Sequence, residues 1–334
     1  MRNLPKVICS SVVRTSQQGE SHGGIYLVDL QNGETREVLN WNDEKINWEG
    51  RGGDRGLRGI AFYDGLILCA ASNELLFFNR DFDIVERYSN AYLQHCHEIA
   101  VEGGTLYLSS TGFDSVLTFD LASRSFQWGY CLRKRYKKNA VFRAARKYRL
   151  LPVAWMYRFS KFHCNESNGP ERGDSTHINN VFARNGRVFF SGTELNCLYE
   201  IDKNGQLSVK SPIHSGTHNV QLVGDYIIYN NTKNDCISAI PIEAKKGNEP
   251  FEFPHPEVEQ AQLQHGDAPK DHARSNFARG LCSTGDLLIG GTSPSTLHVY
   301  SLSEKKLLKS VVLSRDVRNA IHGLEIVPEG LLGE

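Results

Sequence analysis

Short apolar runs recur along the chain, and each follows a turn that contains glycine or aspartate. Five of these runs are closely alike, at 66–70, 106–110, 188–192, 226–230 and 287–291. A polar stretch and a second apolar run come next, at 74–79, 115–120, 197–202, 236–241 and 297–302, and a third, more polar run follows in most copies. Turn-bounded runs of this length predict β-hairpins. The chain is therefore expected to consist of repeated antiparallel sheets.

Each repeat opens on a short strand that begins with histidine or arginine. The six opening residues are Arg58, His97, His177, His218, Arg279 and His322. Their spacings of 39, 80, 41, 61 and 43 residues fit one repeating unit, which an insertion lengthens in two places. A unit of about 40 residues is typical of a four-stranded propeller blade.

The two ends of the chain complete the count of blades. The last opening strand, 322–327, has no room for partners after it, whereas the N-terminal segment contains three strand-like runs at 6–10, 24–30 and 35–39. Joining them closes a ring without a free edge. We therefore predict an all-β, six-bladed β-propeller in which residues 1–334 form a single domain. An open solenoid is the competing architecture, but the sequence lacks the capping repeats that it requires.

Two insertions interrupt the repeat. The first, 131–175, carries eleven basic residues and no acidic one between Arg133 and Lys161, with spaced aromatic residues. It predicts one or two amphipathic helices, which form either a solvated lid or, over 131–163, a surface for an anionic membrane or another acidic partner. The second, 245–275, is rich in proline, glycine and charge and predicts a long polar loop, with His255, His265 and His272 at the surface.

Composition disfavours several classes of protein. The 334 residues include 38 basic and 38 acidic side chains, so a nucleic-acid binder is not expected. No stretch approaches the roughly 18 apolar residues of a transmembrane helix, and residues 1–20 lack the pattern of a secretory signal. Eight cysteines occur singly without a CxxC pair, which indicates reduced thiols in a cytoplasmic protein.

The repeated opening position carries the candidate chemistry. The first strand of each blade lines the central channel of a propeller, so the six opening residues are expected to form one ring around the axis. Six side chains that can carry positive charge would repel one another in a narrow channel. Neutral imidazoles that share a divalent metal would avoid this repulsion. A bound anion, or ordered water in a merely structural filling, would also relieve it.

The predicted metal ligands are the four histidines of this ring, His97, His177, His218 and His322. Coordination by three of them, with the fourth as acid or base, is an open alternative. The ring position holds no carboxylate or thiolate, which disfavours Ca²⁺ and Mg²⁺. Four imidazoles suit Fe(II) and dioxygen chemistry, and three imidazoles with a bound water suit Zn. Glu98 and Glu194 are candidate partners for the second ring nitrogen of a ligand histidine.

The two arginines of the ring suggest the charge of a ligand. Arg58 and Arg279 belong to the blades that flank the last blade, so both are expected beside His322. Guanidinium groups near a metal that neutral imidazoles hold would favour a small anionic substrate, such as a carboxylate, sulfonate or phosphate. The alternative is that these arginines bind a carbonyl or carboxylate between blades. No catalytic residue is assigned.

The blade length and strand pattern resemble those of six-bladed propellers of the NHL and SMP-30/gluconolactonase-like group. SMP-30-like enzymes use carboxylate and asparagine ligands, which this ring position lacks, so their activity is not implied. The histidine ring resembles the axial four-histidine iron centre of the carotenoid cleavage oxygenases, which are longer and seven-bladed. That resemblance implies iron ligation by the four histidines, support from Glu98, and a membrane-facing entrance at 131–163.

The sequence leaves three candidate functions. The leading one is a non-haem oxidoreductase, a dioxygenase with Fe(II) on the propeller axis that acts on an anionic or partly lipidic small molecule. The second is a Zn-dependent lyase or hydrolase at the same place. The third is a propeller scaffold without enzymatic activity that binds an acidic partner or a membrane surface through residues 131–163.

Overall fold

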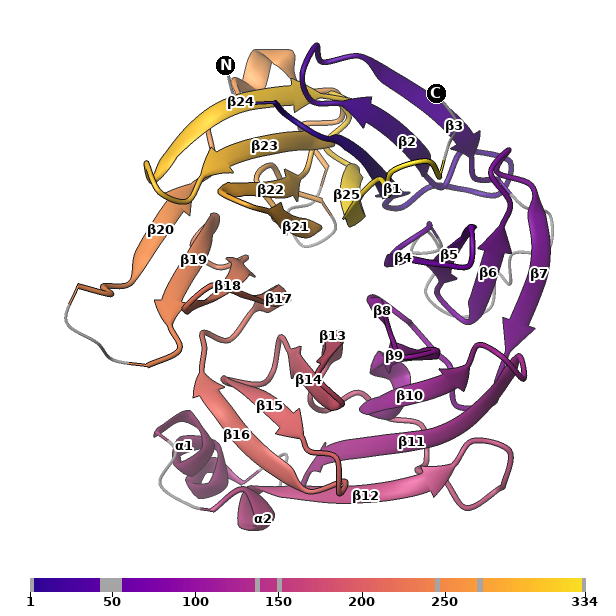
Figure 1. Cartoon of the computed structure of the whole chain (residues 1–334). Helices are drawn as coiled ribbons and strands as arrows, with labels where there is room; N and C mark the ends of the chain where they lie inside the picture. Colours follow the sequence, from indigo (N-terminus) through magenta and orange to yellow (C-terminus); the bar gives the residue numbers. More distant parts are fainter. Residues whose placement is uncertain are drawn as a thin grey trace.

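A computed structural model gives the structure of the chain, and it describes residues 3–42, 56–135, 139–148, 152–243, 247–268 and 273–331. Within them, six antiparallel sheets stand around a common axis, five with four strands and one with five. Figure 1 looks along this axis and shows the sheets as the blades of a ring. The predicted all-β, six-bladed propeller is confirmed.

The strands of each blade follow one another outward from the axis. The innermost strands are β4 (Ile60–Tyr63), β8 (Ile99–Glu102), β13 (Ile178–Arg184), β17 (Thr217–Val223), β21 (Leu281–Thr284) and β25 (Asn319–Ile326). The second strands are β5 (Leu66–Ala71), β9 (Thr105–Ser110), β14 (Arg187–Gly192), β18 (Tyr226–Asn231), β22 (Leu287–Thr292) and β1 (Lys6–Val13). We number the blades 1 to 6 in this order, so that β25 and β1 belong to blade 6.

The outer strands continue the same order. The third strands are β6 (Glu74–Phe78), β10 (Ser115–Asp120), β15 (Cys197–Ile201), β19 (Cys236–Pro241), β23 (Thr296–Ser301) and β2 (Gly24–Asp29). The fourth strands are β7 (Ile84–Ser89), β11 (Ser125–Lys134), β16 (Leu207–Pro212), β20 (Phe251–Pro254), β24 (Lys306–Val312) and β3 (Thr35–Asn40). Two 3₁₀ turns, η1 (Thr111–Phe113) and η2 (Gln260–Gln262), lie in connecting segments.

The apolar runs of the sequence form the middle strands because both faces of these strands are covered by neighbouring blades. All six residues of β23 are buried, and so are the central four of β5. A strand covered on both faces has a continuous apolar pattern rather than an alternating one. The outer strands face solvent on one side and are correspondingly more polar, as β3 shows.

Blade 6 is closed by the two ends of the chain, as predicted. Strand β25 pairs with β1, with Cys9 opposite Leu324 and Ser11 opposite Ile321, and a bulge in β25 places His322 and Gly323 opposite Ser10. The hydroxyl of Ser10 accepts from the amide of Gly323 at 2.8 Å and donates to the carbonyl of Arg58 at 2.5 Å. The closure therefore also ties blade 6 to blade 1.

The first insertion contains the expected helices and one strand that the sequence reading did not predict. Helices α1 (Ala140–Tyr148) and α2 (Val153–Met156) are followed by β12 (Tyr157–His163), which pairs with β11 as a fifth strand of blade 2. Strand β11 itself extends to Lys134, beyond the run predicted at 125–129. The basic residues conceal the strand pattern, because Arg158 and Lys161 are both exposed but lie three residues apart, on opposite faces of β12, and so break the apolar–polar alternation.

The second insertion is less loop-like than predicted. Strand β20 forms the outer edge of blade 4, and it buries Phe253. His255 was predicted at the surface, and this prediction is wrong: it is buried, its ring stacks on His298 at 5.5 Å, and its Nδ1 lies 3.1 Å from the hydroxyl of Tyr300. His265 is exposed, as expected, and pairs with Asp316 at 3.2 Å. His272 lies outside the described residues.

Within the ranges that the structure describes, no helix is long and apolar enough to cross a membrane.

Candidate functional site at the propeller axis

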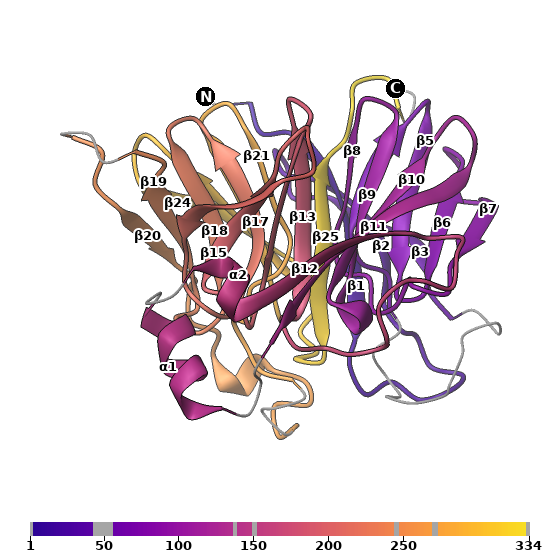
Figure 2. The same cartoon turned by 90° about the horizontal axis from the view of Figure 1, so that it is seen from below.

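The six predicted ring residues lie together at one end of the axis. Arg58, His97, His177 and Arg279 come immediately before their innermost strands, whereas His218 and His322 lie inside theirs. All innermost strands run along the axis away from this end. Helix α1 projects from the same end (Figure 2). The rings of His97 and His177 are 5.5 Å apart between centroids, and those of His97 and His322 are 5.3 Å apart.

Tight contacts between blades bring these side chains close to one another. A Cβ added to Gly323 would lie 2.3 Å from the carbonyl oxygen of Arg58, so only glycine fits directly after His322. The side chains fill the axis at this level, since Arg58 is fully buried and His97, His218, Arg279 and His322 are also buried. His177 is the most accessible of the six, with 28% of its side chain exposed.

The two arginines donate to two of the histidines. Nη1 of Arg58 lies 3.1 Å from Nε2 of His97, and Nη1 of Arg279 lies 2.6 Å from Nε2 of His322. A guanidinium group can only donate, so each Nε2 must be the unprotonated, accepting nitrogen of its ring. In His97 the Nδ1 proton is directed to the carbonyl of His95 at 2.7 Å, which fits the same tautomer. Both arginines therefore face the axis, but they bind histidines there.

The buried imidazoles are held in the neutral form. Burial lowers the pKa of His97, His218 and His322 well below its usual value, and the nearby Arg58 and Arg279 lower it further. The repulsion expected among six cationic side chains is thus relieved by arginine-to-histidine hydrogen bonds. The sequence predicts that a metal, an anion or ordered water relieves this repulsion, and hydrogen bonds between arginine and histidine are not among those predictions.

The arrangement of the donors does not fit a four-histidine metal centre. The lone pairs at Nε2 of His97 and His322 already accept from guanidinium groups. Across the described part of the chain, no group of three or more His, Cys, Asp or Glu residues is placed to hold a metal ion. His218 differs from the other two, because its Nδ1 lies 3.3 Å from the carbonyl of Gly216 and its buried Nε2 has no hydrogen-bond partner among the described residues.

The two predicted supporting carboxylates have other partners. Glu194 is exposed and pairs with Lys134 at 2.9 Å. Glu98 accepts from the side-chain amide of Asn219 at 2.6 Å. Burial and the neighbouring Glu325 raise the pKa of Glu98 well above its usual value, and burial raises that of Glu325 to about 8. Glu98 immediately precedes β8, and Glu325 lies on β25.

His177 has a carboxylate partner that the sequence reading missed. Its Nδ1 lies 2.8 Å from Oδ2 of Asp174, three residues earlier in the loop before β13. With Nδ1–H donating to the carboxylate, Nε2 is the nitrogen that can accept a proton. An imidazole oriented by a carboxylate and partly open to solvent can exchange a proton with a bound molecule. The spacing of Asp174 and His177 in one loop was a signal that could have indicated this pair.

Three arginines gather around one aromatic ring at the same end of the axis. The guanidinium carbons of Arg14, Arg274 and Arg279 lie 4.9, 5.0 and 4.8 Å from the ring centroid of Phe277. The ring of His218 is 5.9 Å from the same phenyl ring. We call Arg14, Arg274, Phe277 and Arg279, together with His177, the axial mouth. Arg14 and Arg274 lie outside the repeated register, so the repeat pattern could not reveal them.

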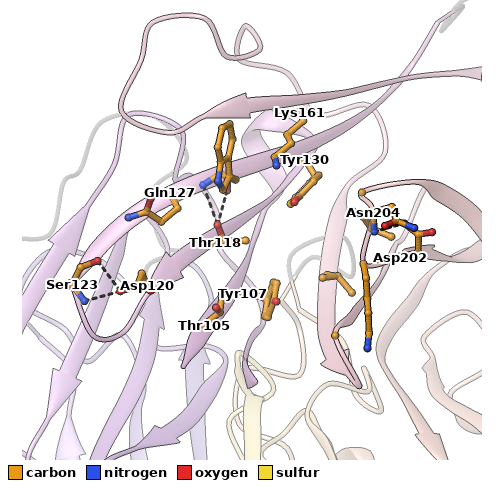
Figure 3. A pocket seen from close by; sticks show the side chains of 16 residues that line it. Thr105, Tyr107, Thr118, Asp120, Ser123, Gln127, Tyr130, Lys161, Asp202 and Asn204 are labelled. Atoms are coloured by element: carbon orange, nitrogen blue, oxygen red, sulfur yellow. Dashed lines mark hydrogen bonds between the residues drawn. The ribbon is translucent and has the colours of Figure 1, made fainter. Parts of the chain in front are cut away.

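A hollow lies at the opposite end of the molecule, between blades 2 and 3. This groove has a volume of about 640 Å³, and Figure 3 shows Tyr130, Lys161, Asp120 and Asp202 along its sides. Its carboxylates serve hairpin turns, since Asp120 accepts from the amide of Ser123 and Asp202 from that of Asn204. The ammonium of Lys161 lies over Trp128, 4.0 Å from the ring centroid. These groups have structural partners, so the axial mouth is the stronger candidate site.

Comparison with known proteins identifies the fold alone. No family model and no curated protein matches the chain. A chain in the crystal structure of a nidogen–laminin complex superposes with a TM-score of 0.57 over 96% of this chain and 97% of that one, at 8% identity. A computationally designed protein, Ika8, has a TM-score of 0.46 at 10% identity, over 96% of this chain and 91% of its own. A catalytically inactive virginiamycin B lyase from Staphylococcus aureus with quinupristin also has a TM-score of 0.46 at 10% identity, over 88% of this chain and 80% of its own.

Proposed function

We propose that the axial mouth binds a small anionic molecule. The observation that carries this proposal is the cluster of three guanidinium groups around Phe277. Asp235 pairs with Arg274 at 2.6 Å and offsets part of this positive charge, and a bound anion would offset more of it. Guanidinium groups bind carboxylates and phosphates through paired hydrogen bonds. The phenyl ring of Phe277 adds an apolar contact, so the ligand class that fits is an organic carboxylate, sulfonate or phosphate.

The predicted roles of the two ring arginines differ under this proposal. Arg279 belongs to the mouth, because it contacts both His322 and Phe277. Arg58 is fully buried beside His97, so it stabilises the neutral imidazole and does not touch the ligand. His177, oriented by Asp174, is the group that would exchange a proton with the bound anion. A proton-transfer enzyme, such as a lyase or hydrolase, is therefore the activity that we propose for this site.

Replacing Arg274 by glutamine is expected to weaken anion binding by about 10- to 100-fold, which corresponds to loss of one charge-assisted hydrogen bond. The measurement is calorimetric titration with phosphate, sulfate and short organic carboxylates, each compared with an uncharged analogue of similar size. Arg124→Gln is a matched control. Arg124 also lies over a phenyl ring, 4.8 Å from the centroid of Phe77, pairs with Glu86, and is exposed to nearly the same extent, 28% against 29%.

The control variant should bind anions as the wild-type protein does, because Arg124 lies in the turn between β10 and β11, at the other end of the propeller. If Arg124→Gln and Arg274→Gln weaken binding equally, or if uncharged analogues bind as well as anions, the proposed anion site is wrong.

An iron centre is the second candidate, since four histidines share one register at the axis, as in the carotenoid cleavage oxygenases that the ring resembles. It requires Arg58 and Arg279 to leave the Nε2 atoms that they now contact. Bound Fe(II) would supply dioxygen activation, and bound Zn would supply a Lewis acid. We expect elemental analysis of protein purified without a metal-affinity tag to find less than stoichiometric iron and zinc. Stoichiometric metal that is lost in His97→Ala/His218→Ala would favour this second candidate.

We also propose a cytoplasmic location. All eight cysteines are buried and free of disulfide bonds. Burial raises the pKa of Cys96 and Cys164 to about 12, which keeps these thiols protonated and unreactive. Unpaired thiols in this number are typical of proteins in a reducing compartment.

A further inference from the structure

We propose that the insertion between β11 and β12 docks on an anionic membrane surface. The insertion leaves blade 2 at Lys134 and returns at Tyr157, and the amide of Lys134 donates to the hydroxyl of Ser175, just before His177. It therefore departs from the end of the propeller that carries the axial mouth. Figure 2 shows α1 extending beyond the strands at this end.

The helices expose large apolar side chains. Val141 and Tyr148, at the two ends of α1, are 73% and 63% exposed, and Trp155 in α2 is 63% exposed. Among the other residues whose side-chain exposure the structure describes, no large apolar side chain exceeds 50%, and those that approach this value are single residues on outer strands, such as Val85 and Val312. Three exposed, large apolar side chains on the two helices of one insertion are typical of a contact surface. Tryptophan and tyrosine are the residues that favour the membrane–water interface.

The positive charge of the insertion favours an anionic surface as its binding partner. Residues 133–161 include eleven lysines and arginines and no acidic residue. Within the described residues, Arg133 pairs with Asp114 at 3.1 Å and Lys134 pairs with Glu194 at 2.9 Å. The basic residues of α1 itself are Arg143, Arg146 and Lys147. Basic residues that accompany exposed aromatic side chains are the two signals by which peripheral proteins bind acidic phospholipids.

A surface-bound geometry also fits the length of the helices. Helix α1 has nine residues and α2 has four, so neither can cross a bilayer. An interfacial helix needs only to place apolar side chains below the headgroups while basic side chains remain among them. Docking in this way would place the axial mouth toward the membrane. The docking surface nevertheless stands on its own observations and does not depend on the anion site.

The test is sedimentation of the protein with vesicles of phosphatidylcholine alone and with vesicles that contain about one third phosphatidylserine. We expect binding to the mixed vesicles only, and at least tenfold weaker binding when the salt concentration is raised. Trp155→Ala should weaken binding about tenfold or more, and so should the triple variant Arg143→Gln/Arg146→Gln/Lys147→Gln. Val312→Ala is the matched control, an exposed apolar residue on outer strand β24, and should bind as the wild type does.

Several results would overturn the docking surface. These are equal binding to the two kinds of vesicle, absence of binding to both, or equal effects of Trp155→Ala and Val312→Ala. Binding of an acidic polypeptide without binding of vesicles would assign the surface to a protein partner instead. Arg274→Gln should leave vesicle binding intact, so failure of the anion site and failure of the docking surface can be told apart. Circular dichroism of each variant confirms that the propeller is folded.

Discussion

Replacing Asp114 by alanine is expected to lower the free energy of unfolding by about 3–5 kcal/mol, the usual cost of removing one partner from a buried charged network. Asp114 is fully buried between blades 2 and 3. Its carboxylate accepts from the backbone amides and the hydroxyls of Ser175 and Thr176, all at 2.7 Å. It also pairs with Arg133 at 3.1 Å. Without the carboxylate, these donors lose their acceptor in a place that water does not reach.

The measurement is urea-induced unfolding of wild type and variant, followed by circular dichroism. Asp120→Ala provides the control, because Asp120 also accepts from a backbone amide and a hydroxyl, both of Ser123, but does so in an exposed hairpin turn. That control should have a much smaller effect, because water can replace the lost acceptor in an exposed turn. A loss below 1 kcal/mol for Asp114→Ala would show that the contact is not important for joining the two blades.

The stability of the protein is expected to be greatest near pH 6.5 and to fall on both sides. On the acidic side, five buried histidines are responsible. Burial lowers the pKa of His255 to about 3 and that of His298 to about 4, and the pKa values of His97, His218 and His322 are also well below the usual value. The unfolded chain binds protons at these residues below about pH 6.5 while the folded protein does not. Each of these histidines therefore lowers the free energy of unfolding by about 1.4 kcal/mol per pH unit as the pH falls below about 6.5.

On the alkaline side, the two axial acids act in the opposite sense. The pKa of Glu325 is raised to about 8 and that of Glu98 is raised well above its usual value. The folded protein retains these protons where the unfolded chain has released them, so the stabilisation from these acids decreases as the pH rises from about 4.5 toward 8. Between about pH 4.5 and 6.5 the five histidines outweigh the two acids, which places the maximum near the usual histidine pKa.

Urea unfolding at pH steps from 4.5 to 8 measures this profile. In His255→Phe, the slope between pH 6.5 and 4.5 should be smaller by about 1.4 kcal/mol per pH unit, whatever the absolute stability of the variant. A stability that stays level or rises as the pH falls through this interval would contradict the expectation.

The fold could be predicted from the sequence because its information is local and repeated. Each hairpin has its own turn and its own apolar run, and a period of about 40 residues admits few architectures. The position of the ring followed in the same way, since a residue that opens the innermost strand of every blade must lie at the axis. Strand β12 was missed because it is an addition to the repeat, in a segment rich in basic residues. Strand β20, the fourth strand of blade 4, was missed because it lies in a segment rich in proline and charge.

The chemistry of the site depended on contacts that the sequence does not encode in a local pattern. Arg58 and His97 open neighbouring blades, and their hydrogen bond depends on the width of the closed ring. The same holds for Arg279 and His322. Phe277 becomes the centre of an arginine cluster only because the loop of Arg14 arrives from the other end of the chain. His255 was assigned to the surface from the polarity of its neighbours, but the stacking on His298 of the next blade decides its burial.

The pairing of β1 with β25 has a consequence for the protein during its synthesis. Ser10 and Gly323, which are hydrogen-bonded across this closure, are 313 residues apart in the sequence. At the usual rate of translation, about 5–20 residues per second, β1 waits roughly 15 to 60 s for its partner to leave the ribosome. During that time one edge of a largely apolar strand is unpaired, which exposes the nascent chain to aggregation. Yield in the cell should therefore depend on chaperones that act at the ribosome, even though both edges of β1 are paired in the finished ring.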